Sequence, residues 1–278
     1  MKWVALRPDI DPVTGALTTD ERWSGPSFAD QAALEVALRL GTERNANVIV
    51  VTVGDAAADP LLTEAMACGA AHAIRIDSSS LSADSQPSSA SVAAAIGEVL
   101  RPLQPQLVLC GDWSLDRGSG SVPAFLAAEL EYGQACGIVT VHEYMADEQL
   151  RVDRRLDGGR RETLIVSGPT VLSVEGAAAR LRRANLAGIL TAQKTPINVR
   201  ATTRLAASPT PAHTGPFRPR ARILDAPSSP EPRQRLEVLT GAFTKRNPPV
   251  RATLDPEAAA DLILSTLAEW GYELPATP

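Results

Sequence analysis

The chain has 278 residues, of which 44% are hydrophobic and 21% are charged, as in ordinary soluble globular proteins. Aromatic residues make up 4% of the chain and the formal net charge is −5. The chain therefore offers few platforms for stacking bases and no overall excess of positive charge. This composition excludes a typical nucleic-acid-binding domain.

The cysteines and histidines are scattered along the chain. They form no CxxC pair and no group at the spacing of a metal site. We therefore expect no catalytic constellation and no bound metal, and we expect the cysteines to pack in the core. These residues are Cys68, Cys110, Cys136, His72, His142 and His213.

No apolar run approaches the roughly 20 residues that a membrane-spanning helix needs. Met1 and Lys2 lead directly into a strand-like run at residues 3–6, without the pattern of a signal peptide. We therefore expect a cytoplasmic protein that does not insert into membranes.

In the first half of the chain, short apolar runs alternate with helical patterns. Strands are expected at residues 3–6, 48–53, 71–76 and 107–110, and helices at residues 28–40, 61–67, 92–100 and from about Pro123 onward. Continuous apolar strands separated by helices predict an α/β domain with a doubly wound, mostly parallel sheet. Because aromatic residues are few, its core should consist of Ala, Leu and Val.

Ligands of such sheets bind beyond the carboxyl ends of the strands, which points to the loops after Ala5, Val53 and Cys110. The third loop, residues 111–121, reads GDWSLDRGSGS, and Pro123 follows it at a position favoured in the first turn of a helix. Small residues beside a helix N-terminus favour an anion, so a phosphate is the expected ligand. A flexible Gly-Ser connection is the alternative, because no Walker lysine follows.

Residues 152–174, VDRRLDGGRRETLIVSGPTVLSV, form the most informative segment. Two β-prone runs, residues 150–156 and 162–167, flank Asp157-Gly158-Gly159, a sequence that accepts positive φ in a tight turn. We expect a β-hairpin here. Taken alone, the Asp-Gly-Gly sequence would indicate only an ordinary β-turn.

Several residues of this segment also match a known signature: Arg154, Asp157, Gly158, Gly159, Glu162, Leu164, Pro169, Val171 and Leu172, with Ser173 standing where Thr, Ala or Cys is preferred. The segment resembles the electron transfer flavoprotein beta-subunit family. The resemblance implies an adenine nucleotide alpha hydrolase-like fold and a role as an electron carrier, not an enzyme. Such a subunit pairs with an alpha subunit that holds most of the FAD. It takes electrons from dehydrogenases and passes them to a downstream, quinone-linked acceptor.

In that family, an AMP with a structural part occupies the corresponding loops. The resemblance implies that AMP, or a second FAD in its place, contacts the first strand, the first helix and the loops after Val53 and Cys110. Trp113 and Arg117 stand where the family usually has smaller, amide-bearing or acidic residues. The implied contact residues are Ala5, Ser27, Phe28, Ala29, Asp30, Val53, Gly54, Gly111, Asp112, Asp116, Gly118, Ser119, Gly120, Ser121 and Val122.

Residues 176–189, GAAARLRRANLAGI, are rich in Ala and Arg. They correspond in the family to the recognition loop that docks on a partner dehydrogenase, with Leu186 as the apolar anchor and Arg183 beside it. An exposed leucine among arginines suits a transient contact, because apolar area gives affinity and charge steers the encounter. Without the resemblance, an amphipathic helix packed in the core is the alternative.

The C-terminal part differs in composition from the rest. Residues 209–249 are rich in Pro and Arg and show little periodicity, which predicts an extended arm. A terminal helix should follow, with Asp255 as its N-cap, Pro256 in its first turn and Gly271 past its end. The resemblance implies that both pack on the alpha subunit, and a disordered linker to a stray helix is the alternative.

We therefore expect a nucleotide-binding α/β domain at residues 1–200 and an arm with a terminal helix at residues 201–278. The short Gly-Ser loop and the Arg-rich arm are similar to those of the mycofactocin-associated beta subunits, whose dehydrogenases retain their nicotinamide cofactor. A stand-alone adenine-nucleotide sensor of the stress-protein type, which shares the doubly wound sheet, is the alternative function.

Overall fold

The computed structural model describes residues 1–79, 87–144, 149–207, 226–240 and 251–272. The chain divides into two compact units, Met1–Phe217 and Arg218–Pro278. Within the described ranges, no helix is both long enough and apolar enough to cross a membrane.

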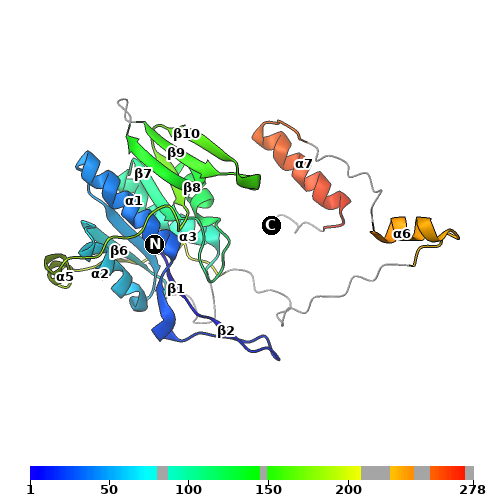
Figure 1. Cartoon of the computed structure of the whole chain (residues 1–278). Helices are drawn as coiled ribbons and strands as arrows, with labels where there is room; N and C mark the ends of the chain where they lie inside the picture. The colour runs from blue at the N-terminus through cyan, green and yellow to red at the C-terminus, as the bar shows by residue number, and fades with distance from the viewer. Residues whose placement is uncertain (80–86, 145–148, 208–225, 241–250, 273–278) are drawn as a thin grey trace. The chain divides into compact units, whose positions relative to one another are not determined.

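The first unit combines parallel strands with helices, as the sequence predicts (Figure 1). The strands of its larger sheets are β5 (Ile49–Gly54), β6 (His72–Asp77), β7 (Leu107–Gly111), β8 (Gly133–Tyr144), β9 (Leu150–Arg155), β10 (Arg161–Val166), β11 (Thr170–Val174) and β12 (Asn198–Arg200). One sheet, of order β12-β6-β5, is wholly parallel. In the other, of order β10-β9-β8-β11-β7, β11 pairs parallel with β7 and β8, and β9 and β10 extend the sheet antiparallel.

The helices between these strands begin and end at local signals. They are α1 (Phe28–Arg44), α2 (Asp59–Ala67), α3 (Ser89–Leu100) and α4 (Val122–Leu130), with single 3₁₀ turns η1 (Glu21–Trp23), η2 (Ala56–Ala58) and η3 (Arg101–Leu103). Asn45 ends α1 in the left-handed conformation, and the Ser88 hydroxyl caps α3 by accepting the Ser91 N–H. The predicted helices are confirmed.

The core of the first unit consists mainly of alanine and branched aliphatic side chains, as the composition predicts. On α1, Ala32, Ala33 and Val36 pack against sheet residues that include Ile138 and Leu172. Small alanines let the helix approach the sheet closely, so the interior fills without aromatic side chains.

The first strand differs from its prediction. β1 (Trp3–Ala5) pairs antiparallel with β4 (Ser24–Pro26) and with no strand of the two larger sheets. The N-terminus nevertheless lies against β5, because the Met1 ammonium donates a hydrogen bond to the Val51 carbonyl at 2.8 Å. Assigning residues 3–6 to the parallel sheet was wrong, because the chain returns beside them at β4 and supplies their backbone partners locally.

The sequence analysis did not predict the small hairpin between β1 and β4. Its strands are β2 (Asp9–Ile10) and β3 (Leu17–Thr18), and it extends from the first unit (Figure 1). Its large side chains Ile10, Val13 and Leu17 are exposed. A projecting hairpin with exposed apolar side chains is a candidate contact surface.

The hairpin of β9 and β10 is confirmed. The chain turns at η4 (Asp157–Gly159), where Gly158 and Gly159 have φ values of 71° and 75°, in the left-handed region that favours glycine. Arg154 and Glu162 form an ion pair across the strands. Residues 150–166 therefore form the expected hairpin, and the positive φ values of its turn explain why two glycines stand there.

In the second unit, α7 (Pro256–Glu269) confirms the predicted terminal helix. Asp255 caps it by accepting the Ala258 N–H at 2.9 Å, and Gly271 follows with a φ of 80°. None of the residues of α7 is buried.

The arm is not wholly without secondary structure, because α6 (Pro232–Thr240) forms within it. Pro232 opens this helix, and Leu236 and Leu239 recur at helical spacing, a short signal that the prediction of an irregular arm overlooked. Residues 208–225 and 241–250 of the expected arm lie outside the described residues.

Candidate functional site

A cavity of about 520 Å³ lies at the carboxyl ends of β5, β6 and β7. Its wall includes Val53 near the end of β5 and Asp55 after that strand, Ser78 and Ser79 after β6, and much of residues 110–123, from the end of β7 to the start of α4. In α/β proteins this edge of the sheet is where ligands bind, and the volume suits a small organic ligand.

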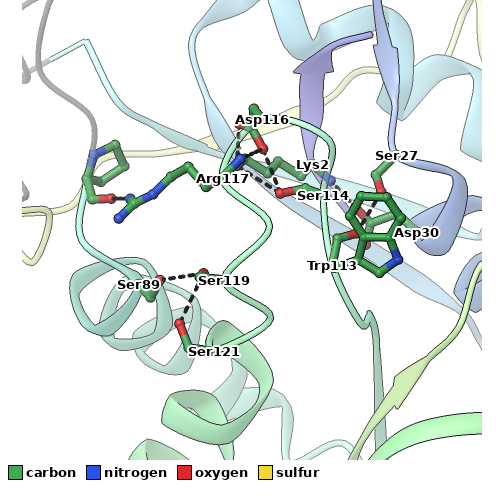
Figure 2. Close-up of polar contacts among 11 residues, drawn as sticks. Lys2, Ser27, Asp30, Ser89, Trp113, Ser114, Asp116, Arg117, Ser119 and Ser121 are labelled. Atoms are coloured by element: carbon green, nitrogen blue, oxygen red, sulfur yellow. Dashed lines mark hydrogen bonds and ion pairs between the residues drawn. The ribbon is translucent and has the colours of Figure 1, made fainter. Parts of the chain in front are cut away.

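Asp30 joins three segments behind the cavity. It lies in the first turn of α1, is 8% exposed, and accepts the backbone N–H of Lys2 at 2.8 Å and that of Gly111 at 3.0 Å. A Cβ at Gly111 would lie 2.8 Å from the Asp30 nitrogen, so glycine allows this approach. The Ser27 hydroxyl donates to the Trp113 carbonyl at 3.1 Å (Figure 2). The first strand, α1 and the loop after β7 are thereby held together.

Glycines and serines shape the loop after β7. Gly118 and Gly120 have φ values of 61° and 59°, and a Cβ at Gly120 would lie 2.7 Å from the Asp112 carbonyl oxygen. The Ser119 hydroxyl lies 3.4 Å from that of Ser89 and 3.2 Å from that of Ser121 (Figure 2). These hydroxyls line the cavity beside the first turn of α4, whose N-cap residue makes no side-chain cap hydrogen bond. Hydroxyls and unpaired helix N–H groups can together bind an anion.

Asp112 has an unused hydrogen-bonding oxygen in the cavity wall. Its Oδ1 atom is buried and has no hydrogen-bond partner within the described part of the chain. Burial, followed by the nearby Glu175 carboxylate, raises the pKa of Asp112 above its usual value. A ligand group that donates a hydrogen bond would stabilise this oxygen.

The structure brings together many of the residues that the family resemblance implies. Those in the cavity wall are Asp30, Val53, Gly111, Asp112, Asp116, Ser119, Gly120, Ser121 and Val122. The others, which support the wall or neighbour it in sequence without lining it, are Ala5, Ser27, Phe28, Ala29, Gly54 and Gly118. Nucleotide contact by any of these residues stays a prediction.

Sequence reasoning missed the wall residues that follow β6 and those of α3. These include Ser78, Ser79, Ser89, Val92 and Ile96. A signal existed for the two serines after β6, because the rule that pointed to the loops after β5 and β7 applies equally to the strand between them in sequence. Lys2 carried no such signal, since only folding brings it beside the loop after β7.

A second candidate surface lies on α5 (Leu186–Ala192), which begins at the predicted anchor. Leu186 is 71% exposed, and Ile189 and Leu190 on the same helix are also exposed. Asn185 caps the helix by accepting the Gly188 N–H at 2.7 Å. At Gly188, α5 lies against α2 so closely that a Cβ would be 2.5 Å from the Ala67 carbonyl oxygen. A fixed helix thus presents an exposed apolar patch.

The segment before α5 borders an open groove of about 810 Å³ beside α2. Arg180 and Arg183 line it, are exposed and form no ion pair with any described residue. Arg182 instead binds Glu35 of α1, with its Nε 2.9 Å from Oε2 and its NH2 3.0 Å from Oε1. One arginine therefore anchors the segment, and the neighbouring arginines stay available for an acidic partner.

Comparison with known proteins links this arrangement to one family. The model of the electron transfer flavoprotein domain matches residues 20–205. The electron transfer flavoprotein subunit beta of Bradyrhizobium diazoefficiens is 30% identical over 169 residues, which cover 60% of this chain and 65% of that protein. That of Dictyostelium discoideum is 28% identical over 187 residues, covering 67% and 71%. Subunit CarD of the caffeyl-CoA reductase-Etf complex of Acetobacterium woodii is 29% identical over 192 residues, covering 68% and 71%.

The chain spans just under two thirds of the Bradyrhizobium protein's length, at 65%. The family model nevertheless matches more than half of this chain, and the matched residues 20–205 include α1, the loop after β7, the β9–β10 hairpin and α5. This protein therefore belongs to the electron transfer flavoprotein domain family.

Proposed function

We propose that this protein is the beta subunit of a heterodimeric electron transfer flavoprotein. The observation that carries the proposal is the family match at residues 20–205, together with relatives that are named as beta subunits. In this role the chain takes part in carrying electrons from dehydrogenases to a downstream, quinone-linked acceptor, through FAD held mainly by an alpha subunit. It forms one wall of the flavin site, a nucleotide site and docking surfaces, and it catalyses no bond-making or bond-breaking step of its own.

The cavity at the carboxyl ends of β5, β6 and β7 is the proposed nucleotide site. Its polar loop would hold the phosphate against the hydroxyls of Ser119 and Ser121 and the first turn of α4. The unpartnered Asp112 oxygen suits a hydrogen-bond donor on the sugar or base. AMP is the proposed occupant, and a second FAD in its place is the alternative.

The proposed dehydrogenase contact is α5 with the arginines that precede it. Leu186, exposed at the start of the helix, would enter an apolar pocket of the dehydrogenase. Arg183 would steer an acidic rim toward it. The mycofactocin-associated subgroup is the proposed affiliation, which would make the partners dehydrogenases that retain their nicotinamide cofactor.

The test is coproduction with an alpha-type partner from the same source, followed by absorbance and nucleotide analysis of the purified complex. We expect a stable heterodimer with flavin bands and about one adenine nucleotide released on heating. A monodisperse, fully folded monomer that recruits no partner and no flavin would contradict the proposal. A homodimer that binds only an adenine nucleotide would favour the stress-protein type of sensor.

A further inference from the structure

The cavity has an unusual charge balance for a phosphate site. Its described wall contains the carboxylates of Asp30, Asp55, Asp112 and Asp116, but only two cationic side chains, those of Lys2 and Arg117. The Met1 ammonium, which also belongs to the wall, already donates to the Val51 carbonyl at 2.8 Å. A phosphate monoester carries close to two negative charges at neutral pH, with a second pKa of about 6. In such surroundings it needs a cation that can reach it.

Arg117 is already engaged at one side of the cavity. Its guanidinium donates a hydrogen bond to the Pro87 carbonyl, just before α3 (Figure 2). This contact bridges the loop after β7 to the segment that leads into α3. Arg117 therefore holds these two segments of the cavity wall together.

Lys2 is held differently. Its backbone is fixed, because its N–H donates to Asp30 at 2.8 Å and its carbonyl accepts the Ser27 N–H at 3.3 Å. Its side chain is 41% exposed, and the ammonium lies 2.5 Å from Asp116 Oδ2 and 3.4 Å from the Ser114 hydroxyl (Figure 2). An ammonium on a flexible stem can exchange one acceptor for another without moving the backbone.

Resting on the proposed function, we infer that Lys2 is the phosphate-binding cation of this site and that Asp116 competes with the phosphate for it. When the nucleotide is absent, the ammonium pairs with Asp116. When a nucleotide enters, the ammonium turns to the phosphate, and Asp116 keeps its hydrogen bond from the Ser114 hydroxyl at 2.6 Å. Lys2 thereby selects a nucleoside monophosphate over the bare nucleoside.

Two observations favour this exchange. A half-exposed ion pair contributes little stability, so breaking it costs little. Burial opposes ionisation of Asp116, but hydrogen bonds from Lys2 and Ser114 outweigh it and hold the pKa of that carboxyl below its usual value. Asp116 is therefore charged at neutral pH and is a real competitor for the ammonium.

The experiment measures binding of AMP and of adenosine to the nucleotide-depleted complex with the alpha partner, by calorimetry. We expect Lys2→Met to weaken AMP binding about tenfold or more, as the loss of a charge-assisted hydrogen bond does, and to leave adenosine binding unchanged. Asp116→Asn should strengthen AMP binding several-fold, and this gain should vanish in the Lys2→Met background. Lys194→Met, at an exposed lysine, is the control and should bind AMP like the wild type.

The variants separate this role from a purely structural one. If the Lys2–Asp116 pair only fastens the loop, Asp116→Asn will weaken AMP binding as Lys2→Met does, which would overturn the inference. Equal losses for AMP and adenosine in Lys2→Met would also overturn it. If the Lys2→Met variant does not assemble with the alpha partner, the Asp116→Asn variant decides by itself: stronger AMP binding supports the inference and weaker binding overturns it. A wild-type complex that binds neither ligand overturns the nucleotide site and this inference with it, whereas bound AMP without the opposed effects overturns the inference alone.

Discussion

At the scale of single residues, Gly120 and Gly158 both have a positive φ but lie in different surroundings. Their φ values are 59° and 71°. A Cβ at Gly120 would lie 2.7 Å from the Asp112 carbonyl oxygen, whereas a Cβ at Gly158 would meet nothing within 4 Å. A side chain in this conformation costs roughly 1–2 kcal/mol at either position. Only at Gly120 would it also push on the cavity loop.

We therefore expect Gly158→Ala to lower the free energy of unfolding by about 1–2 kcal/mol. Gly120→Ala should lower it by more, because its Cβ would also lie 2.7 Å from the Asp112 carbonyl oxygen. Only Gly120→Ala should also release the bound nucleotide. The measurements are chemical denaturation and the nucleotide content of the purified complex. Full nucleotide occupancy in Gly120→Ala would show that the loop after β7 does not hold the phosphate.

At the scale of elements, the Glu35–Arg182 pair fastens the segment before α5 to α1. Burial by itself would raise the pKa of Glu35, but the hydrogen bonds and charge of Arg182 outweigh it and hold that pKa below the ordinary value of 4.5. The folded pKa is thus lower than the unfolded one. The stabilisation is therefore present above pH 4.5 and is lost as the pH falls through the folded pKa.

Hydrogen exchange of residues 180–192 should report this linkage. We expect protection at neutral pH that declines below pH 4.5, and Glu35→Gln should lower protection at neutral pH by about 1 kcal/mol and remove the pH dependence. Glu237→Gln, which breaks the exposed Arg233–Glu237 pair of α6, is the control and should change little. Unchanged exchange in Glu35→Gln would mean that α2 alone holds α5 in place.

The proposed docking role of α5 is tested at Leu186. Leu186→Arg should keep the flavin spectrum and the thermal stability, because the side chain is 71% exposed and buries little within this chain. Partner-dependent electron transfer should fall, with a loss of about 1–3 kcal/mol in docking affinity as for a modest hot spot. Ile165→Arg, at an exposed residue of β10, is the control. Normal transfer with every dehydrogenase tried would rule out α5 as the recognition element.

At the scale of the whole molecule, the exposed apolar side chains of α7 favour packing against a partner protein. Its Leu262, Ile263 and Leu264, and the following Trp270, are all exposed, and a free helix of this length is marginal in water. We expect the isolated protein to aggregate and coproduction with an alpha subunit to keep it soluble.

Replacing Leu262 and Ile263 by Ser should reduce assembly, measured as heterodimer recovered by size exclusion. The paired change of Glu257 and Asp261 to Ser on the same helix should not. Equal recovery of both variants would remove α7 from the interface.

Local patterns in the sequence were enough to place the helices α1 to α4 and α7, the strands β5, β6, β7, β9 and β10, the β9–β10 turn and the caps of α7. Their causes lie within a few residues: the run of alanine and leucine in α1, the paired glycines at residues 158 and 159, and Asp255 before Pro256. The same locality explains why the sequence indicated the loop after β7 as a candidate phosphate site, since its glycines and serines are contiguous. It also indicated Leu186 as the anchor, through a family motif that is local in the chain.

Only the tertiary structure decided how distant segments meet. The antiparallel pairing of β1 depends on the return of the chain at β4, which no periodicity within residues 3–6 can encode. Asp30 draws together Lys2 and Gly111, and Lys2 reaches Asp116 more than a hundred residues away. Contacts of this range follow from how the sheets and α1 pack. The loop after β7 could therefore be predicted from the sequence, whereas the lysine placed beside it could not.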